Sequence, residues 1–185
     1  GRDLAATGVS SAAIGSSSTA SGQFALAIGT SGPNGSATNP NGYGAIASGD
    51  SSLAIGHSTQ ATAAGATAIG GAQNDSIPGA NASGVHATAI GGQTVASGAA
   101  SLALGSNLEG YSGANATGEK AIAVGAAATA SGAQSVVVGT NSSATGTAGI
   151  AMGRNVINQG NDAQAIGNSA SVRSNYGTAL GTFAT

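Results

Sequence analysis

The sequence predicts an all-β chain folded as a parallel solenoid of 14-residue coils, and three observations lead to this fold class. A motif of the form aliphatic–Ala–aliphatic–Gly recurs along the chain, small and large side chains alternate within it, and a second glycine lies half a repeat away. Self-similarity at one fixed period identifies a repeat protein before any element is assigned. We therefore expect residues 1–185 to form a single domain of about eleven coils.

The motif ends in glycine eleven times, and successive glycines lie 14 residues apart except at three intervals of 27, 21 and 20 residues. These intervals place insertions near residues 30–42, 71–77 and 106–111. Each coil is numbered 1–14 below, with this glycine at position 14. The position-14 glycines are Gly15, Gly29, Gly56, Gly70, Gly91, Gly105, Gly125, Gly139, Gly153, Gly167 and Gly181.

Positions 10–14 are expected to form the first strand of each coil. Position 10 is always Ser, Ala or Gly and position 12 is Ala in ten coils, whereas position 13 is always a large aliphatic residue and position 11 is one in six coils. A period of two is typical of a strand with unlike faces. A helix is excluded because a glycine at every seventh residue would cost about 1 kcal/mol each in a helix interior.

A second, weaker strand is expected at positions 3–7, where positions 5 and 7 are Ala and Gly in nine coils each. Stacking such coils at about 4.8 Å pairs each strand with its counterpart in the next coil and gives two parallel sheets back to back. We expect the turns near the glycines of positions 7 and 14, where a positive φ or a close backbone approach would make a β-carbon costly.

The large aliphatic residues are expected on the outside, because a coil with only two short strands has interior room for Ala, Ser and Gly. They would form an exposed stripe larger than a soluble monomer normally leaves bare, which predicts an interface. Identical rods repeat this stripe with the same spacing, so a homo-oligomer is the simplest partner. The alternative is a monomer whose aliphatic residues fill a wider interior. The predicted interface residues are Leu26, Ile28, Leu53, Ile55, Ile69, Ile90, Leu102, Leu104, Ile122, Val124, Val136, Val138, Ile150, Met152, Ile166 and Leu180.

The motif resembles the Ser–Val–Ala–Ile–Gly signature of the head repeats of trimeric autotransporter adhesins, the YadA-like family. It reads Ser52-Leu53-Ala54-Ile55-Gly56, Ser101-Leu102-Ala103-Leu104-Gly105, Ala121-Ile122-Ala123-Val124-Gly125 and Ser135-Val136-Val137-Val138-Gly139. The resemblance covers essentially the whole chain apart from the insertions. It implies a left-handed parallel β-roll, a homotrimer around the aliphatic stripe, and a position at the bacterial cell surface.

The sequence lacks the coiled-coil stalk and the membrane-anchor barrel of that family, and it lacks the Asn that often opens the signature. The chain also stops just inside another coil. We therefore expect an excerpt of a longer protein that is anchored in the outer membrane through regions outside this chain.

Composition argues against several classes of partner and site. Only 5% of the residues are charged, and the four basic residues form no stripe for a phosphate backbone, so nucleic acid is not expected as a partner. No apolar run is long enough for a membrane helix, so this segment is not expected to contact a membrane. The absence of cysteine excludes disulfides and thiolate metal sites. Composition alone would allow disorder, but the periodicity argues against it.

No enzyme, cofactor or metal site is expected. His57 and His86 each stand outside any catalytic motif, and the carboxylates do not show the spacing of a calcium loop. The glycines lack the context of a phosphate-binding loop and are interpreted as turn residues. The adjacent Glu119 and Lys120 are expected to form a surface ion pair.

The insertions are candidate recognition loops, because long loops on a rigid solenoid often carry binding residues. An equally good interpretation is that they clasp a neighbouring subunit or cap the rod. The residues singled out are Pro33, Asn34, Asn39, Asn74, Asp75, Leu108, Glu109 and Tyr111.

The resemblance predicts an adhesin head that attaches to host matrix proteins such as collagen, fibronectin or laminin, or to the cell surface, and that supports autoaggregation. The alternative is a structural spacer or self-association segment of a surface fibre without its own ligand. An ice-binding solenoid would need Thr in one column, whereas Thr is scattered over several columns here.

Overall fold

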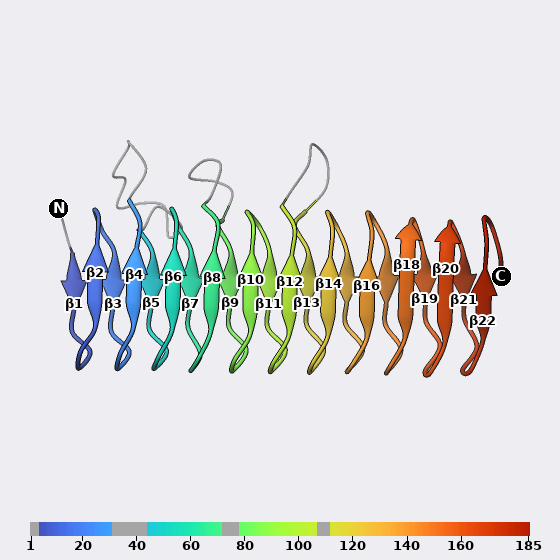
Figure 1. Cartoon of the computed structure of the whole chain (residues 1–185), viewed down its shortest axis with the longest axis horizontal. Helices are drawn as coiled ribbons and strands as arrows, with labels where there is room; N and C mark the ends of the chain where they lie inside the picture. Colours follow the sequence, from blue (N-terminus) through green and yellow to red (C-terminus); the bar gives the residue numbers. More distant parts are fainter. Residues whose placement is uncertain (1–3, 31–43, 72–77, 107–111) are drawn as a thin grey trace.

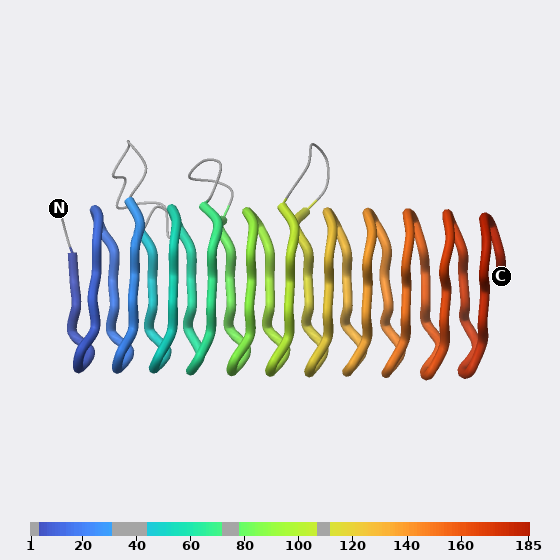
Figure 2. Tube along the Cα trace, viewed as in Figure 1, coloured from blue at the N-terminus to red at the C-terminus, as the bar shows by residue number. Residues whose placement is uncertain are grey.

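The computed structural model describes residues 4–30, 44–71, 78–106 and 112–185. The chain winds into a rod of stacked coils, with β1 and β22 at opposite ends (Figure 1). Each coil contributes two short strands and two turns, and the same path repeats along the whole rod (Figure 2). The predicted all-β parallel solenoid of about eleven turns is therefore confirmed.

Within these described ranges the strands form two parallel sheets of eleven strands each, one from the odd-numbered and one from the even-numbered strands. The odd sheet contains β1 (Ala5–Ala6), β3 (Thr19–Ala20), β5 (Ile46–Ala47), β7 (Gln60–Ala61), β9 (Asn81–Ala82), β11 (Val95–Ala96), β13 (Asn115–Ala116), β15 (Thr129–Ala130), β17 (Ser143–Ala144), β19 (Ile157–Asn158) and β21 (Ser171–Val172). The even sheet contains β2 (Ala12–Ile14), β4 (Leu26–Ile28), β6 (Leu53–Ile55), β8 (Thr67–Ile69), β10 (Thr88–Ile90), β12 (Leu102–Leu104), β14 (Ile122–Val124), β16 (Val136–Val138), β18 (Ile150–Arg154), β20 (Gln164–Asn168) and β22 (Thr178–Leu180).

The pairing register follows the repeat through all three insertions. Ala123 pairs with Val137 one period later. Ala27 pairs with Ala54 although 27 residues separate them. Each insertion therefore leaves the stacking of equivalent positions unchanged, and the columns read from the sequence are columns in space.

The strands are shorter than predicted. They occupy positions 11–13 in most of the even sheet and positions 4–5 in the odd sheet, where the sequence suggested positions 10–14 and 3–7. The reason lies at positions 2 and 9, where described non-glycine residues have φ near +55°, as in Gln134 and Asn141. A left-handed residue ends an extended strand, so each strand is confined between two such residues. None of the residues in this conformation is β-branched, in keeping with its steric cost.

The core is made almost entirely of alanine. The alanines at positions 5 and 12, such as Ala27, Ala54 and Ala130, are fully buried, and the largest fully buried apolar side chains are Val137 and Val156. The small columns therefore face inward, as predicted. The alternative in which the large aliphatic residues fill a wider interior is wrong.

Glycine is required where consecutive coils touch. A β-carbon on Gly132, at position 7, would overlap the carbonyl oxygen of Gly146 in the next coil. Gly139, at position 14, has φ +140°, and a β-carbon there would overlap the carbonyl oxygen of Gly153. The predicted close approach thus holds at both positions, and the positive φ holds at position 14 in every coil except that of Gly29.

Asn158 is a polar exception inside the alanine core. Its Nδ2 donates to the carbonyl oxygens of Ala163 at 2.7 Å and Ile150 at 2.9 Å, and its Oδ1 accepts from the Gly160 amide at 3.1 Å. Gly149 provides the space, since a β-carbon there would lie 3.3 Å from Asn158 Nδ2. The large residue at position 5 is therefore matched by a glycine at position 10 of the preceding coil.

This pairing predicts a coupled effect on stability. Asn158→Ala is expected to lower the free energy of unfolding by about 2 kcal/mol, because it removes three hydrogen bonds and leaves a cavity. Adding Gly149→Ala places alanine both at position 5 and at position 10 of the preceding coil, a combination that other coils have. The double variant should recover about half of the lost free energy of unfolding. Urea unfolding of the two single variants and the double variant measures the coupling. Strictly additive losses would contradict the proposed match of sizes.

Candidate oligomer interface

The outer surface of the even sheet is lined by the large side chains of positions 11 and 13, and we call this surface the aliphatic face. None of the predicted interface residues is buried within the single chain. Leu104 and Met152 are each 40% exposed and Leu180 is 64% exposed, while most of the others are half-buried. The structure therefore places all of these residues where a partner could contact them.

Column 13 of the aliphatic face holds a large aliphatic residue in every coil and column 11 in six, and parallel pairing places equivalent residues side by side. In column 11, Leu102 pairs with Ile122 and Ile122 with Val136 on adjacent strands of the even sheet. In column 13, Val124 pairs with Val138 and Val138 with Met152. Neighbouring side chains in a column cover part of one another's sides, but the outer ends of these side chains stay in contact with solvent. A second rod with the same spacing could interdigitate with these two columns.

The outer surface of the odd sheet has a different character. Its position-4 side chains are mostly polar, with Thr129 and Ser143 adjacent on β15 and β17. The column reads Ala5, Thr19, Ile46, Gln60, Asn81, Val95, Asn115, Thr129, Ser143, Ile157 and Ser171. An apolar partner would therefore gain most by covering the aliphatic face and leaving the odd sheet in water.

The two columns of the aliphatic face, positions 11 and 13, contain no charged side chain in any coil. Glu119 and Lys120 form the expected ion pair, with Lys120 Nζ 3.0 Å from Glu119 Oε1, and both side chains are 61% exposed in the turn before β14. Covering columns 11 and 13 thus buries no charged side chain, while Arg154, exposed at the end of β18 two residues beyond Met152, lies at the border of the face.

The described residues contain no cluster of side chains that could hold a metal ion. His86 is exposed, and its ring lies against Gly65 in the preceding coil. His57 lies half-buried in a different turn. No group of three or more His, Cys, Asp or Glu residues lies close enough to hold a metal ion within the described ranges. The same part of the chain has no helix with the length and apolarity needed to cross a membrane.

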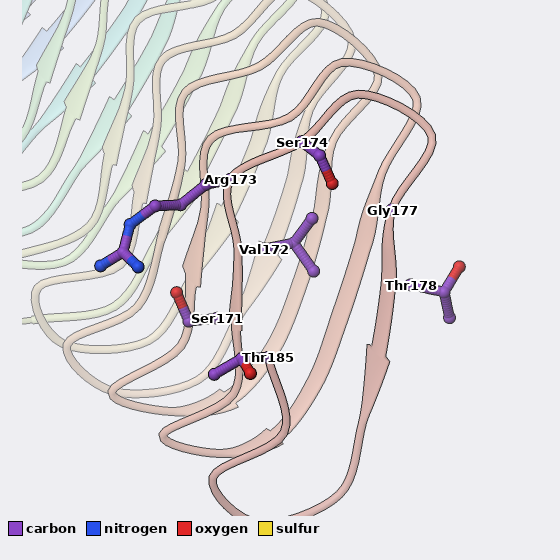
Figure 3. A pocket seen from close by; sticks show the side chains of 7 residues that line it. All are labelled: Ser171, Val172, Arg173, Ser174, Gly177, Thr178 and Thr185. Atoms are coloured by element: carbon purple, nitrogen blue, oxygen red, sulfur yellow. The ribbon is translucent and has the colours of Figure 1, made fainter.

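A pocket lies at the end of the rod, where the core of the last coil is open (Figure 3). Val172 and Ser174 point into the coil, whereas Arg173 and Thr178 point away from it. The alternation of inward and outward side chains is visible there in a single coil. The pocket is thus the uncovered cross-section of the solenoid, and its one charged group, Arg173, faces away.

The candidate loop residues Pro33, Asn34, Asn39, Asn74, Asp75, Leu108, Glu109 and Tyr111 lie outside the described residues. The turn conformations at positions 2 and 9 were missed by the sequence reasoning. The signal for them was the absence of Val, Ile and Thr from nearly every copy of these two columns.

Comparison with known families agrees with the columns described above. The family model of the YadA head domain repeat (2 copies) matches residues 6–31, 42–72, 82–107, 116–142, 130–155 and 159–184. Most matches span about two coils, and together they cover well over half of the chain. No curated protein matches the chain. On the strength of the family match and the repeating coils that it follows, the chain belongs to the family of YadA head domain repeats.

Proposed function

We propose that the chain is the head module of a bacterial surface adhesin, and that three copies associate through the aliphatic face. The observation that carries the proposal is the apolar surface formed by columns 11 and 13, which contain no charged residue, on one sheet of a chain that belongs to the YadA head repeats. A surface of that kind is stabilised by exclusion from water when it packs against a matching rod.

Three rods packed around one axis would turn their odd sheets outward. The exposed surface of the assembly would then consist mainly of Ser, Thr, Asn and Gln side chains together with the turns. The proposed winding is left-handed. In Figure 1 the even strands lie in front and run upward while the odd strands run downward behind, as the chain advances from β1 to β22, which supports this hand.

The proposed ligands are host matrix proteins such as collagen, fibronectin or laminin, or other groups on the host cell surface. The outward surface offers neutral donors and acceptors such as Gln60, Thr129 and Ser143, so attachment would depend on hydrogen bonds more than on charge. Three identical surfaces on one trimer would raise the apparent affinity of weak binding through avidity. Autoaggregation would follow if the same surfaces bind one another between cells. Anchoring to the outer membrane would be supplied by regions outside this chain.

A second candidate function is a structural spacer that only extends a fibre. The observation that favours it is the regularity of the described coils, which present the same small side chains repeatedly. A spacer would need the trimer but would bind no host molecule.

Surface binding assays separate the two functions. Purified protein is passed over immobilised collagen, fibronectin and laminin, with serum albumin as the control surface. We expect saturable binding to at least one matrix protein, and a drop of about 100-fold in apparent affinity for a variant that no longer trimerises. Trimeric protein that binds none of these surfaces or intact host cells would exclude adhesion and leave the spacer.

A further inference from the structure

Two pairs of polar residues interrupt the aliphatic face. Column 11 reads Ala12, Leu26, Leu53, Thr67, Thr88, Leu102, Ile122, Val136, Ile150, Gln164 and Thr178 from the first coil to the last. Thr67 and Thr88 are paired on β8 and β10, and Gln164 and Thr178 are paired on β20 and β22. Each pair thus forms a polar layer two coils thick within an apolar column.

Among the described residues, these polar side chains have no hydrogen-bond partner. No hydrogen bond joins the hydroxyl of Thr67 or Thr88 to another described residue. Thr67 and Thr88 are half-buried between Leu53 and Leu102 of the neighbouring strands, and Gln164 and Thr178 are exposed beyond Ile150. A polar group covered by a partner must find a hydrogen bond there or lose its hydration without compensation.

A rod of identical coils meets a problem when it associates with copies of itself. Sliding one rod by a single coil keeps nearly all apolar contacts, because the aliphatic columns repeat at the strand spacing of about 4.8 Å. Reversing one rod also keeps an apolar column against an apolar column. Apolar burial has no direction, so it distinguishes these arrangements only weakly.

We propose that the two polar layers, Thr67 with Thr88 and Gln164 with Thr178, fix the parallel and in-register arrangement of the subunits. This inference rests on the proposed homotrimer. In the aligned arrangement each polar side chain lies level with the same residue of the other two copies, and hydroxyl and amide groups can hydrogen-bond to one another or share water. A single buried polar position sets register in coiled coils by the same principle.

The other arrangements are penalised by the order of column 11. A shift of one coil places Thr88 level with Leu102, or Gln164 level with Ile150. A reversed rod places Thr67 level with Val136 and Gln164 level with Leu26. Each mismatch covers a hydroxyl or amide with an aliphatic side chain. The free-energy cost of that burial disfavours the shifted and reversed arrangements and so makes the aligned one specific.

Register can be measured by disulfide formation, because the chain has no native cysteine. Chains carrying Ile122→Cys and chains carrying Val136→Cys, which lie on adjacent coils, are co-expressed with different tags. A disulfide needs α-carbons within about 7 Å. A disulfide between two cysteines at the same position (a like pair) therefore reports aligned subunits, and one between Cys at 122 and Cys at 136 (an unlike pair) reports a shift of one coil. Val124→Cys with Val138→Cys repeats the measurement in column 13. This second pair is needed if the column-11 residues of two subunits lie too far apart to form a disulfide.

The expected result is at least a tenfold excess of like over unlike disulfides in the otherwise unchanged chain. After Thr67→Val, Thr88→Val, Gln164→Leu and Thr178→Val, the excess should fall to about threefold or less while the trimer persists. Thr19→Val with Thr129→Val on the odd sheet is the matched control and should keep the original excess. A trimer whose excess is unchanged by the four substitutions would overturn the inference, whereas failure of every chain to trimerise would overturn the proposed function.

Discussion

Gly139→Ala is expected to lower the free energy of unfolding by about 3 kcal/mol or more. Gly139 has φ +140°, a region that is essentially restricted to glycine. The added β-carbon would also overlap the carbonyl oxygen of Gly153, which belongs to the backbone of the next coil and cannot rotate away. Urea unfolding at a fixed protein concentration measures the loss.

Gly181→Ala is the matched control in the same column. Gly181 has φ +121°, but no atom lies within 4 Å of the position that its β-carbon would take. This variant therefore bears only the conformational cost, which we expect to be about 1–2 kcal/mol. Equal losses for the two variants would show that the contact between coils contributes nothing, and the account of the position-14 glycines would have to be abandoned.

Ile69→Asp combined with Ile90→Asp is expected to dissociate the assembly. The two residues are paired on β8 and β10 in column 13 of the aliphatic face. In a trimer, each of the two layers would bury three carboxylates without partners, and burying an unpaired charge costs several kcal/mol. Light scattering coupled to size-exclusion chromatography should show the mass of one chain, or unfolded protein if the single rod is unstable alone.

Two adjacent coils farther along the rod supply a control on the opposite sheet. Thr129→Asp with Ser143→Asp adds the same two charges at position 4, where the side chains of β15 and β17 lie on the polar outer surface. This control should keep the mass of the unchanged protein. If the Ile69→Asp, Ile90→Asp variant also keeps that mass, the aliphatic face is not the interface.

The sequence was sufficient to predict the fold because the solenoid imposes one environment on each column. Ala27 and Ala54 are buried since every copy of position 12 lies between two sheets, and Ile28 and Ile55 are outside since every copy of position 13 points the other way. Eleven copies make such a pattern visible where one copy of a strand would be ambiguous.

Three features could not be predicted in this way. The strand ends depend on left-handed residues such as Phe24 and Lys120, which share no side-chain type and are recognisable only by the exclusion of β-branched residues. Asn158 departs from its column, and its space is created by Gly149 in another coil. The insertions carry no repeat, so the columns give no information about them.

The predicted interface residues lie on the outer side of the even sheet, but that they form an interface stays a prediction, since a partner does not follow from the single chain. An apolar column specifies only that something apolar covers it. The polar side chains of Thr67, Thr88, Gln164 and Thr178 add the directional information, because each of them must be satisfied by a group at one particular level of the partner.

The mass of the unchanged protein in solution tests the central claim, that the aliphatic face joins three copies of this chain. Sedimentation equilibrium over a 100-fold range of protein concentration measures it without reference to shape. The account predicts a mass three times the 16.9 kDa of one chain, maintained on dilution. A mass of 16.9 kDa throughout the range would contradict it, since the aliphatic face would then remain in water.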